Sequence, residues 1–183
     1  MAARSASDRL TVMTTARRLV LVRHAKAARP SEGDDHDRPL DPRGRRDAPA
    51  LGRWLADHAG GIDLVLCSSA ERTKETWALA AAELPDEPAV EVVQRLYLAS
   101  PGQVLEAVRE VNPDVGTLAV IGHEPVLSTL SHALAGPGSD PGCRTALAAG
   151  FSTSAVAVLE TDDPWDALQP HGARLIAFAA PRG

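Results

Sequence analysis

The sequence predicts an α/β fold, a three-layer α/β/α sandwich whose central sheet is mixed and mostly parallel. Three short apolar runs, at 19–22, 62–67 and 117–121, lead to this prediction. They are rich in Val, Leu and Ile and do not alternate polar with apolar residues, which is typical of strands buried on both faces. The segments between them repeat apolar residues at helical spacing, and strands that alternate with helices indicate a sheet covered by helices on both faces.

The expected elements follow one another in a regular order. They are strands at 19–22, 62–67, 90–93, 117–121, 154–159 and 174–179, helices at 41–59, 70–82, 100–108 and 126–134, and loops at 28–37 and 135–149. We expect the last two strands to pair in antiparallel fashion. The loop at 135–149 is rich in Gly and Pro, so we expect at most a short helical turn there.

The first helix has a clear start and one obstacle. Asp41 before Pro42 has the form of an N-cap followed by a proline in the first helical position. Pro49 lies inside the apolar pattern and removes a backbone donor. We therefore expect either a kink at Pro49 or a later helix start at Asp47.

Length and composition indicate one domain and exclude several classes of protein. The chain has 183 residues, 44% of them hydrophobic, and a net charge of −5, which argues against non-specific binding to nucleic acid or an anionic membrane. No apolar stretch approaches the roughly 18 residues of a membrane span. Residues 1–17 contain no signal peptide and are predicted to be a disordered leader, in which Met13 could be the true start. Cys67 and Cys143 form no CxxC pair, so a cytoplasmic protein is expected.

Charged or polar residues follow all three buried strands. Arg23-His24 ends the first, Ser68-Ser69 with Arg72 ends the second, and Gly122-His123 ends the third. In open α/β sheets, ligands lie beyond the carboxyl ends of the strands. If these strands are neighbours, two arginines and two histidines converge. Arginines and helix N-termini favour a small oxyanion, and phosphate fits best.

Two local details favour this interpretation, although each has an alternative. With Ser69 as N-cap, Arg72 would lie in the first helical turn, where a cation opposes the helix dipole. Pro125 suits the first position of the next helix, which would place His123 beside free N–H groups. Alternatively, Arg72 pairs with Glu75 on the surface, and His123 is a core histidine bonded to a carbonyl.

These motifs together resemble those of the histidine phosphatase superfamily, the clan of cofactor-independent phosphoglycerate mutases. More closely, they look like the SixA-type phosphohistidine phosphatases, and the likeness spans roughly residues 19–159 in the family's order. The motifs that carry it are Leu21-Val22-Arg23-His24-Ala25-Lys26-Ala27, Asp37-Arg38-Pro39-Leu40 with Gly44, Ser68 through Arg72 to Thr76, and Ile121-Gly122-His123-Glu124-Pro125. The resemblance implies a single histidine-phosphatase domain at 18–183.

The resemblance also implies the roles of individual residues. His24 would be the nucleophile that carries a transient phosphoryl group, His123 would donate to phosphoryl oxygens, and Arg23 and Arg72 would clamp them. A neutral imidazole is a competent nucleophile at pH 7, and two guanidiniums supply charge neutralisation without a metal or other cofactor. Arg38 and Lys26 are interpreted as peripheral substrate-binding residues.

The chain departs from the mutase pattern where those enzymes carry a glutamate acid. Residues 94–97 read Gln-Arg-Leu-Tyr and contain no carboxylate. General acid catalysis is typically worth about 10²–10⁴-fold, so its absence disfavours poor leaving groups such as sugar alkoxides. This favours phosphohistidine, or an acyl or pyrophosphate-type substrate, over a phosphosugar, and phosphohistidine in a protein is the expected substrate. Asp35, Asp37 or Glu124 could still supply a proton.

Other functions stay open at this point. The enzyme could act on a small phosphorylated metabolite, or the pocket could recognise a phosphorylated partner without turnover. A cysteine phosphatase would need five residues between Cys67 and its arginine, whereas four separate it from Arg72. A zinc hydrolase would draw on His24, His36, His58 and His123, which lack HExxH spacing. The expected rims of the cleft are 28–37 and 135–149, and no oligomeric state is predicted.

Overall fold

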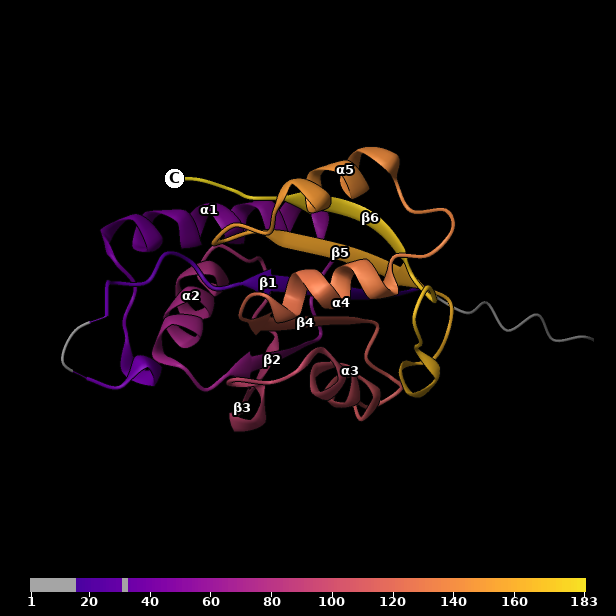
Figure 1. Ribbon diagram of the computed structural model, residues 1–183, viewed down its shortest axis with the longest axis horizontal. Helices are drawn as coiled ribbons and strands as arrows, with labels where there is room; N and C mark the ends of the chain where they lie inside the picture. The colour runs from indigo at the N-terminus through magenta and orange to yellow at the C-terminus, as the bar shows by residue number, and fades with distance from the viewer. Residues whose placement is uncertain (1–15, 31–32) are drawn as a thin grey trace, which may run out of the picture.

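A six-stranded mixed sheet forms the centre of the protein in the computed structural model, which describes residues 16–30 and 33–183 (Figure 1). The strands are β1 (Arg17–Arg23), β2 (Leu64–Ser68), β3 (Ala89–Val93), β4 (Thr117–Gly122), β5 (Val156–Thr161) and β6 (Arg174–Ala179). Their order is β3-β2-β4-β1-β5-β6. Neighbours from β3 to β1 are parallel, whereas β5 is antiparallel to both β1 and β6. The predicted mixed, mostly parallel sheet is confirmed.

Helices cover both faces of this sheet. They are α1 (Pro42–His58), α2 (Glu71–Ala81), α3 (Pro101–Arg109), α4 (Val126–Leu134) and α5 (Pro141–Ala149), with short 3-10 turns η1 (Asp35–Asp37), η2 (Gln94–Leu96) and η3 (Trp165–Ala167). Apolar side chains of α1 and α2 pack on one face, and those of α3, α4 and α5 pack on the other. The three-layer sandwich is therefore confirmed.

Strand β1 shows why the apolar runs do not alternate. Leu19 and Leu21 belong to the core beneath α3, α4 and α5, whereas Val20 and Val22 belong to the core beneath α1 and α2. All four side chains are at most 1% exposed. Because both faces of a central parallel strand are buried, every position along it is apolar.

Two sequence predictions about the ends of elements need correction. Helix α1 is one helix through Pro49 and does not start at Asp47, because the Asp41 carboxylate accepts the Gly44 N–H at 2.7 Å and so caps the helix at its beginning. Strand β1 begins at Arg17, inside the predicted leader; residues 1–15, including Met13, lie outside the described part of the chain.

Among the described residues, no helix is long and apolar enough to cross a membrane.

The prediction of a loop at 135–149 is wrong for most of that stretch. Helix α5 occupies Pro141–Ala149, and the Asp140 carboxylate caps it by accepting the Cys143 N–H at 2.8 Å. Leu147 on this helix is buried in the core beside α3 and α4. The Asp140-Pro141 pair is the same start signal that identifies α1, but the surrounding Gly and Pro content hid it.

Candidate active site

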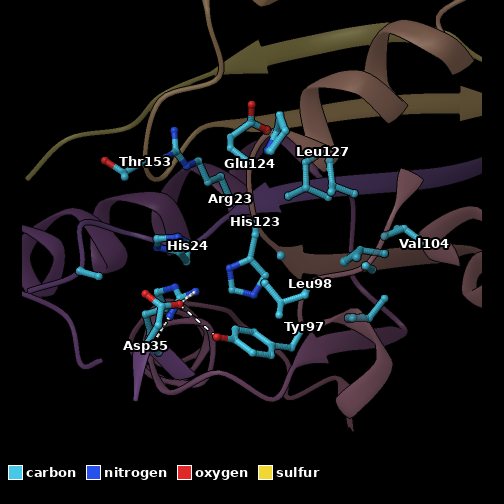
Figure 2. Close-up of a pocket in the computed structure, with 18 of the residues that line it drawn as sticks. Arg23, His24, Asp35, Tyr97, Leu98, Val104, His123, Glu124, Leu127 and Thr153 are labelled. Carbon is cyan, nitrogen blue, oxygen red and sulfur yellow. Dashed lines mark hydrogen bonds and ion pairs between the residues drawn. The ribbon is translucent and has the colours of Figure 1, made fainter. Parts of the chain in front are cut away.

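The carboxyl ends of β1, β2 and β4 lie side by side, and residues at or after these ends line one cavity of about 520 Å³. Arg23 at the end of β1 is in register with Gly122 at the end of β4, and Cys67 in β2 is in register with Ile121. This arrangement brings together the side chains predicted from the three strand ends (Figure 2). The predicted residues that line the cavity are Arg23, His24, Lys26, Arg38, Arg72 and His123.

The His24 imidazole is held in one tautomer and kept neutral. Its Nδ1–H donates to the carbonyl oxygen of Ala25 at 2.7 Å, so the lone pair is on Nε2. The Ala25 N–H in turn donates to the buried Thr76 hydroxyl at 2.9 Å. Burial lowers the pKa of His24 to about 3, because charging the ring would cost its solvation. At neutral pH, Nε2 can therefore act as a nucleophile.

His123 faces His24 across the cavity, with ring centroids 5.3 Å apart. Its Nε2 lies 2.8 Å from the hydroxyl oxygen of Ser68, whereas its Nδ1 is buried and has no hydrogen-bond partner among the described residues. Burial, followed by the positive charge of Arg72, lowers the pKa of His123 to about 4. Pro125 is the N-cap of α4 rather than its first residue, because the helix begins at Val126.

Arg72 is almost fully buried, with 6% of its surface exposed, and it points toward the turn η1. It donates from Nη1 to the backbone oxygen of Asp35 at 2.6 Å and from Nη2 to the Asp35 carboxylate at 3.0 Å. The alternative pairing with Glu75 is wrong. The Glu75 carboxylate instead accepts from the Arg45 guanidinium and from the Leu40 N–H.

Ser69 is not the N-cap of α2. Ala70 takes that position and supplies no side-chain acceptor. The Ser69 hydroxyl instead lies 2.9 Å from Nε2 of His36, on the neighbouring turn η1. The preference of serine for N-caps is therefore overridden here by a contact between segments 33 positions apart.

Arg23 also lines the cavity, and its guanidinium has fewer hydrogen-bond partners than that of Arg72. Its Nη1 donates to the Phe151 carbonyl oxygen at 2.7 Å, whereas its buried Nε has no partner among the described residues. Burial lowers the pKa of this guanidinium from its ordinary value. The cavity thus contains guanidinium N–H donors of Arg23 and Arg72 and the Nε2 lone pair of His24, and it can hold a tetrahedral oxyanion.

Asp35 and Tyr97 also line the cavity, and the sequence did not predict the hydrogen bond between them. The Asp35 carboxylate accepts hydrogen bonds from Arg72, from Nη1 of Arg38 at 2.6 Å and from the Tyr97 hydroxyl at 3.1 Å. The bond from Arg38 is the main cause that lowers the pKa of Asp35. Asp35 is therefore ionised at neutral pH and is poorly suited to act as a general acid.

The outer residues and rims agree only partly with the sequence predictions. Arg38 donates hydrogen bonds to the Asp35 carboxylate and to the Ala28 carbonyl oxygen. Lys26 lines the cavity and is exposed. The expected rim at 28–37 reaches the cavity through Asp35, while residues 31–32 lie outside the described part. The expected rim at 135–149 is wrong, because α5 packs against β6. Thr153 lines the cavity on the side of Arg23, and Tyr97 and Leu98 line it below His123 in the view of Figure 2.

The two alternative chemistries do not match the geometry. Cys67 is 1% exposed inside β2, and burial raises the pKa of its thiol to about 12, so it is not a ready nucleophile. No group of three or more His, Cys, Asp or Glu side chains that could hold a metal ion occurs within residues 16–30 and 33–183. His58 stacks on Trp54 of α1 and lies outside the cavity lining.

The sequence is similar to a known protein family and to two mycobacterial proteins. The sequence profile described as the histidine phosphatase superfamily (branch 1) matches residues 19–99. An uncharacterised protein of Mycobacterium tuberculosis is 41% identical over 162 residues, which cover 88% of this chain and the whole of that protein. An uncharacterised protein of Mycobacterium leprae is 36% identical over 165 residues, with the same coverage of both.

Two solved structures share the fold over nearly the whole chain. A candidate phosphohistidine phosphatase SixA from Nakamurella multipartitia is 36% identical, with a TM-score of 0.79, and the match covers 91% of this chain and 96% of that one. A protein histidine phosphatase SixA complexed with tungstate is 25% identical, with a TM-score of 0.72 and coverage of 90% and 97%.

Proposed function

Because this chain belongs to the histidine phosphatase superfamily and is of the SixA type, we propose that it transfers a phosphoryl group from phosphohistidine in a protein to His24 and then to water. The observation that carries the proposal is the state of His24. Its ring is neutral, its Nδ1–H is bonded to Ala25, and its Nε2 is unprotonated within a cavity lined by Arg23 and Arg72. The domain at 18–183 would suffice for this chemistry.

The proposed reaction has two steps. In the first, Nε2 of His24 attacks phosphorus, the N–P bond of the substrate phosphohistidine breaks, and the released imidazole takes a proton from solvent. In the second, a water oxygen attacks phosphorus, the N–P bond to His24 breaks, and inorganic phosphate leaves. Phosphoryl transfer of this kind depends mainly on positioning and on charge stabilisation.

The surrounding side chains supply both requirements in this proposal. Arg23 and Arg72 offer guanidinium N–H groups to the phosphoryl oxygens, and the nearby His123 ring adds a further contact. Their positive charge neutralises the group during transfer, so the proposed reaction uses no metal ion or cofactor. Arg38 and Lys26 would bind outer parts of the substrate.

The carboxylates of the cavity favour an easily expelled leaving group. Asp35 has a lowered pKa and is engaged by Arg38, Arg72 and Tyr97. Both carboxylate oxygens of Glu124 accept hydrogen bonds from Ser128, at 2.9 Å and 2.6 Å. Neither group is poised to protonate an alkoxide. A phosphoramidate such as phosphohistidine is therefore a better substrate for this site than a sugar phosphate.

A labelling experiment tests the mechanism. The protein would be mixed with ³²P-phosphohistidine peptide and quenched rapidly in alkali, and the protein-bound label would then be tested for loss in acid. We expect an acid-labile label on His24 and release of inorganic phosphate. His24→Ala should abolish both, whereas His132→Ala, which alters an exposed histidine on α4, should leave both unchanged.

Activity and binding measurements on the same proteins separate the alternatives. Full activity in His24→Ala would overturn the mechanism. Faster hydrolysis of a sugar phosphate than of the phosphohistidine peptide would favour a small phosphometabolite as substrate. Tight binding of the phosphopeptide without release of phosphate would indicate a recognition module instead of an enzyme.

A further inference from the structure

The cavity has two chemically different halves, separated by the His123 ring (Figure 2). The half that contains His24 carries the arginines. In Figure 2, Val104, Leu98 and Leu127 lie on the opposite side of His123 from His24. We call this second part the apolar half: it contains Leu98, Val104 and Leu127, and their neighbours in the chain Leu96, Ala99 and Val126 also line the cavity.

Leu98 marks the mouth of the apolar half. It is 81% exposed, more than any other large hydrophobic residue in the described part of the chain, and it lines the cavity. Its φ of 59° lies in the left-handed region, which costs a non-glycine residue roughly 1–2 kcal/mol. A left-handed backbone at a non-glycine residue is unfavourable for folding alone and is typical of binding sites, so this conformation at the cavity points to a use in binding.

Two polar side chains that line the cavity near this half, Tyr97 and Glu124, are already engaged. The Tyr97 hydroxyl donates to Asp35, and both oxygens of the Glu124 carboxylate accept from Ser128. A hydroxyl-rich group placed here would lose water without gaining a partner from these two side chains, which is costly. An apolar group would instead cover the exposed surface of Leu98 and Val126.

From this division we propose that the apolar half is a subsite for an apolar side chain beside the phosphohistidine of the protein substrate. The inference rests on the proposed function and adds to it a preference within phosphohistidine proteins. The cavity of about 520 Å³ is continuous from the arginines to Leu98. One bound segment can therefore place its phosphoryl group near His24 and its apolar neighbour against Leu98.

Two phosphohistidine peptides that differ only in the residues flanking the phosphohistidine test the subsite. One carries leucine at the flanking positions and the other carries serine, and phosphoramidate serves as a substrate without any side chain. We expect kcat/KM to be roughly tenfold higher for the leucine peptide, since one or a few buried methylenes distinguish substrates by this order.

Variants locate the preference within the cavity. Leu98→Ser and Val126→Ser should bring the leucine-to-serine ratio toward one, and kcat/KM should fall much more for the leucine peptide than for phosphoramidate. Val92→Ser, which alters an exposed valine of β3 outside the cavity lining, should keep the wild-type ratio. Because Leu98 and Val126 are at least partly exposed, these substitutions do not remove a fully buried core residue.

The outcomes distinguish this inference from the proposed function. Equal kcat/KM for the two peptides in the wild-type protein would overturn the subsite while leaving the phosphatase reaction intact. Equal loss of activity on both peptides and on phosphoramidate in Leu98→Ser would also overturn it. Absence of hydrolysis of both peptides and of phosphoramidate by the wild-type protein would instead overturn the proposed function.

Discussion

Asp35 and Arg72, 37 positions apart in the sequence, make a two-point contact in the cavity that contains His24: Arg72 donates to the backbone oxygen of Asp35 and to its carboxylate. The backbone contact orients the guanidinium. The carboxylate, in contrast, places a negative charge beside Arg72, and this charge would repel a phosphoryl group that binds the same guanidinium. These two effects can be separated by substitution, because only the second depends on the Asp35 side chain.

Asp35→Asn should strengthen the binding of inorganic phosphate. The amide keeps the size of the side chain but removes its repulsion of the anion, and the backbone contact to Arg72 remains. At separations near 4 Å in a partly hydrated site, removing one charge is worth on the order of a fivefold change in Kd. Isothermal titration calorimetry measures this directly. Weaker phosphate binding in the variant would show that the carboxylate serves mainly to hold Arg72.

Arg72→Ala should reduce kcat/KM far more than Arg38→Ala does. Arg72 is buried and lines the cavity that contains His24, and loss of a preorganised donor there lowers the rate about a hundredfold or more. Arg38 is bonded to Asp35 and to Ala28 at the edge, so we expect a smaller loss. Steady-state hydrolysis of a phosphohistidine peptide compares the two. Equal losses would mean that the inner part of the site has been wrongly assigned.

Ser68→Ala should lower kcat/KM about tenfold by releasing His123, since a buried hydrogen bond is worth about 1 kcal/mol or slightly more. The Ser68 hydroxyl lies 2.8 Å from Nε2 of His123 and fixes that ring. Nitrogen NMR of the imidazoles should show a changed tautomer balance for His123 and unchanged signals for His24. An unchanged His123 spectrum together with lost activity would argue that Ser68 acts in another way.

His24 and His123, the two histidines that line the cavity, should stay neutral well below pH 6.5. The pKa of His24 is lowered to about 3 and that of His123 to about 4, mainly by burial. An unfolded chain binds protons at both rings near pH 6.5, whereas the folded protein does not until the lower values are reached. The free energy of unfolding should therefore decrease as the pH falls from 6.5 toward 4, and be unaffected by these groups above that window.

Urea unfolding at several pH values, with NMR titration of the rings, checks this prediction. A His24→Gln, His123→Gln double variant should show a shallower loss of stability across the same window. Titration of either ring close to pH 6.5 in the folded protein would contradict the effect of burial.

Gly52→Ala should destabilise the protein by about 1–3 kcal/mol, as overpacking in a close contact does. A Cβ at Gly52 in α1 would lie 2.1 Å from the carbonyl oxygen of Ala80 in α2, so the two helices would have to separate. Gly102→Ala is the matched control, because its nearest contact is 3.9 Å away and alanine favours the helix. Urea unfolding should show opposite signs for the two variants.

Much of the fold and of the inner site could be predicted because the signals are local. Strand β1 is buried on both faces, so its sequence is continuously apolar until Arg23 and His24. The same pattern before Ser68 and before His123 identifies three parallel strands whose carboxyl ends meet. The resemblance to the histidine phosphatase superfamily rests on these same short motifs, and the comparisons confirm it.

The remaining features depend on contacts between distant segments. Helix α5 shares its Asp-Pro start with α1, yet Leu147 is stabilised by packing on the core, which no local pattern reveals. Ser69 satisfies His36 instead of capping α2, since the turn η1 lies beside it only in the folded chain. The sequence by itself determined the sheet and the side chains around His24. Only the tertiary structure decided that Asp35 holds Arg72 and that apolar residues of three other segments complete the cavity, because such contacts arise from packing and leave no periodic trace.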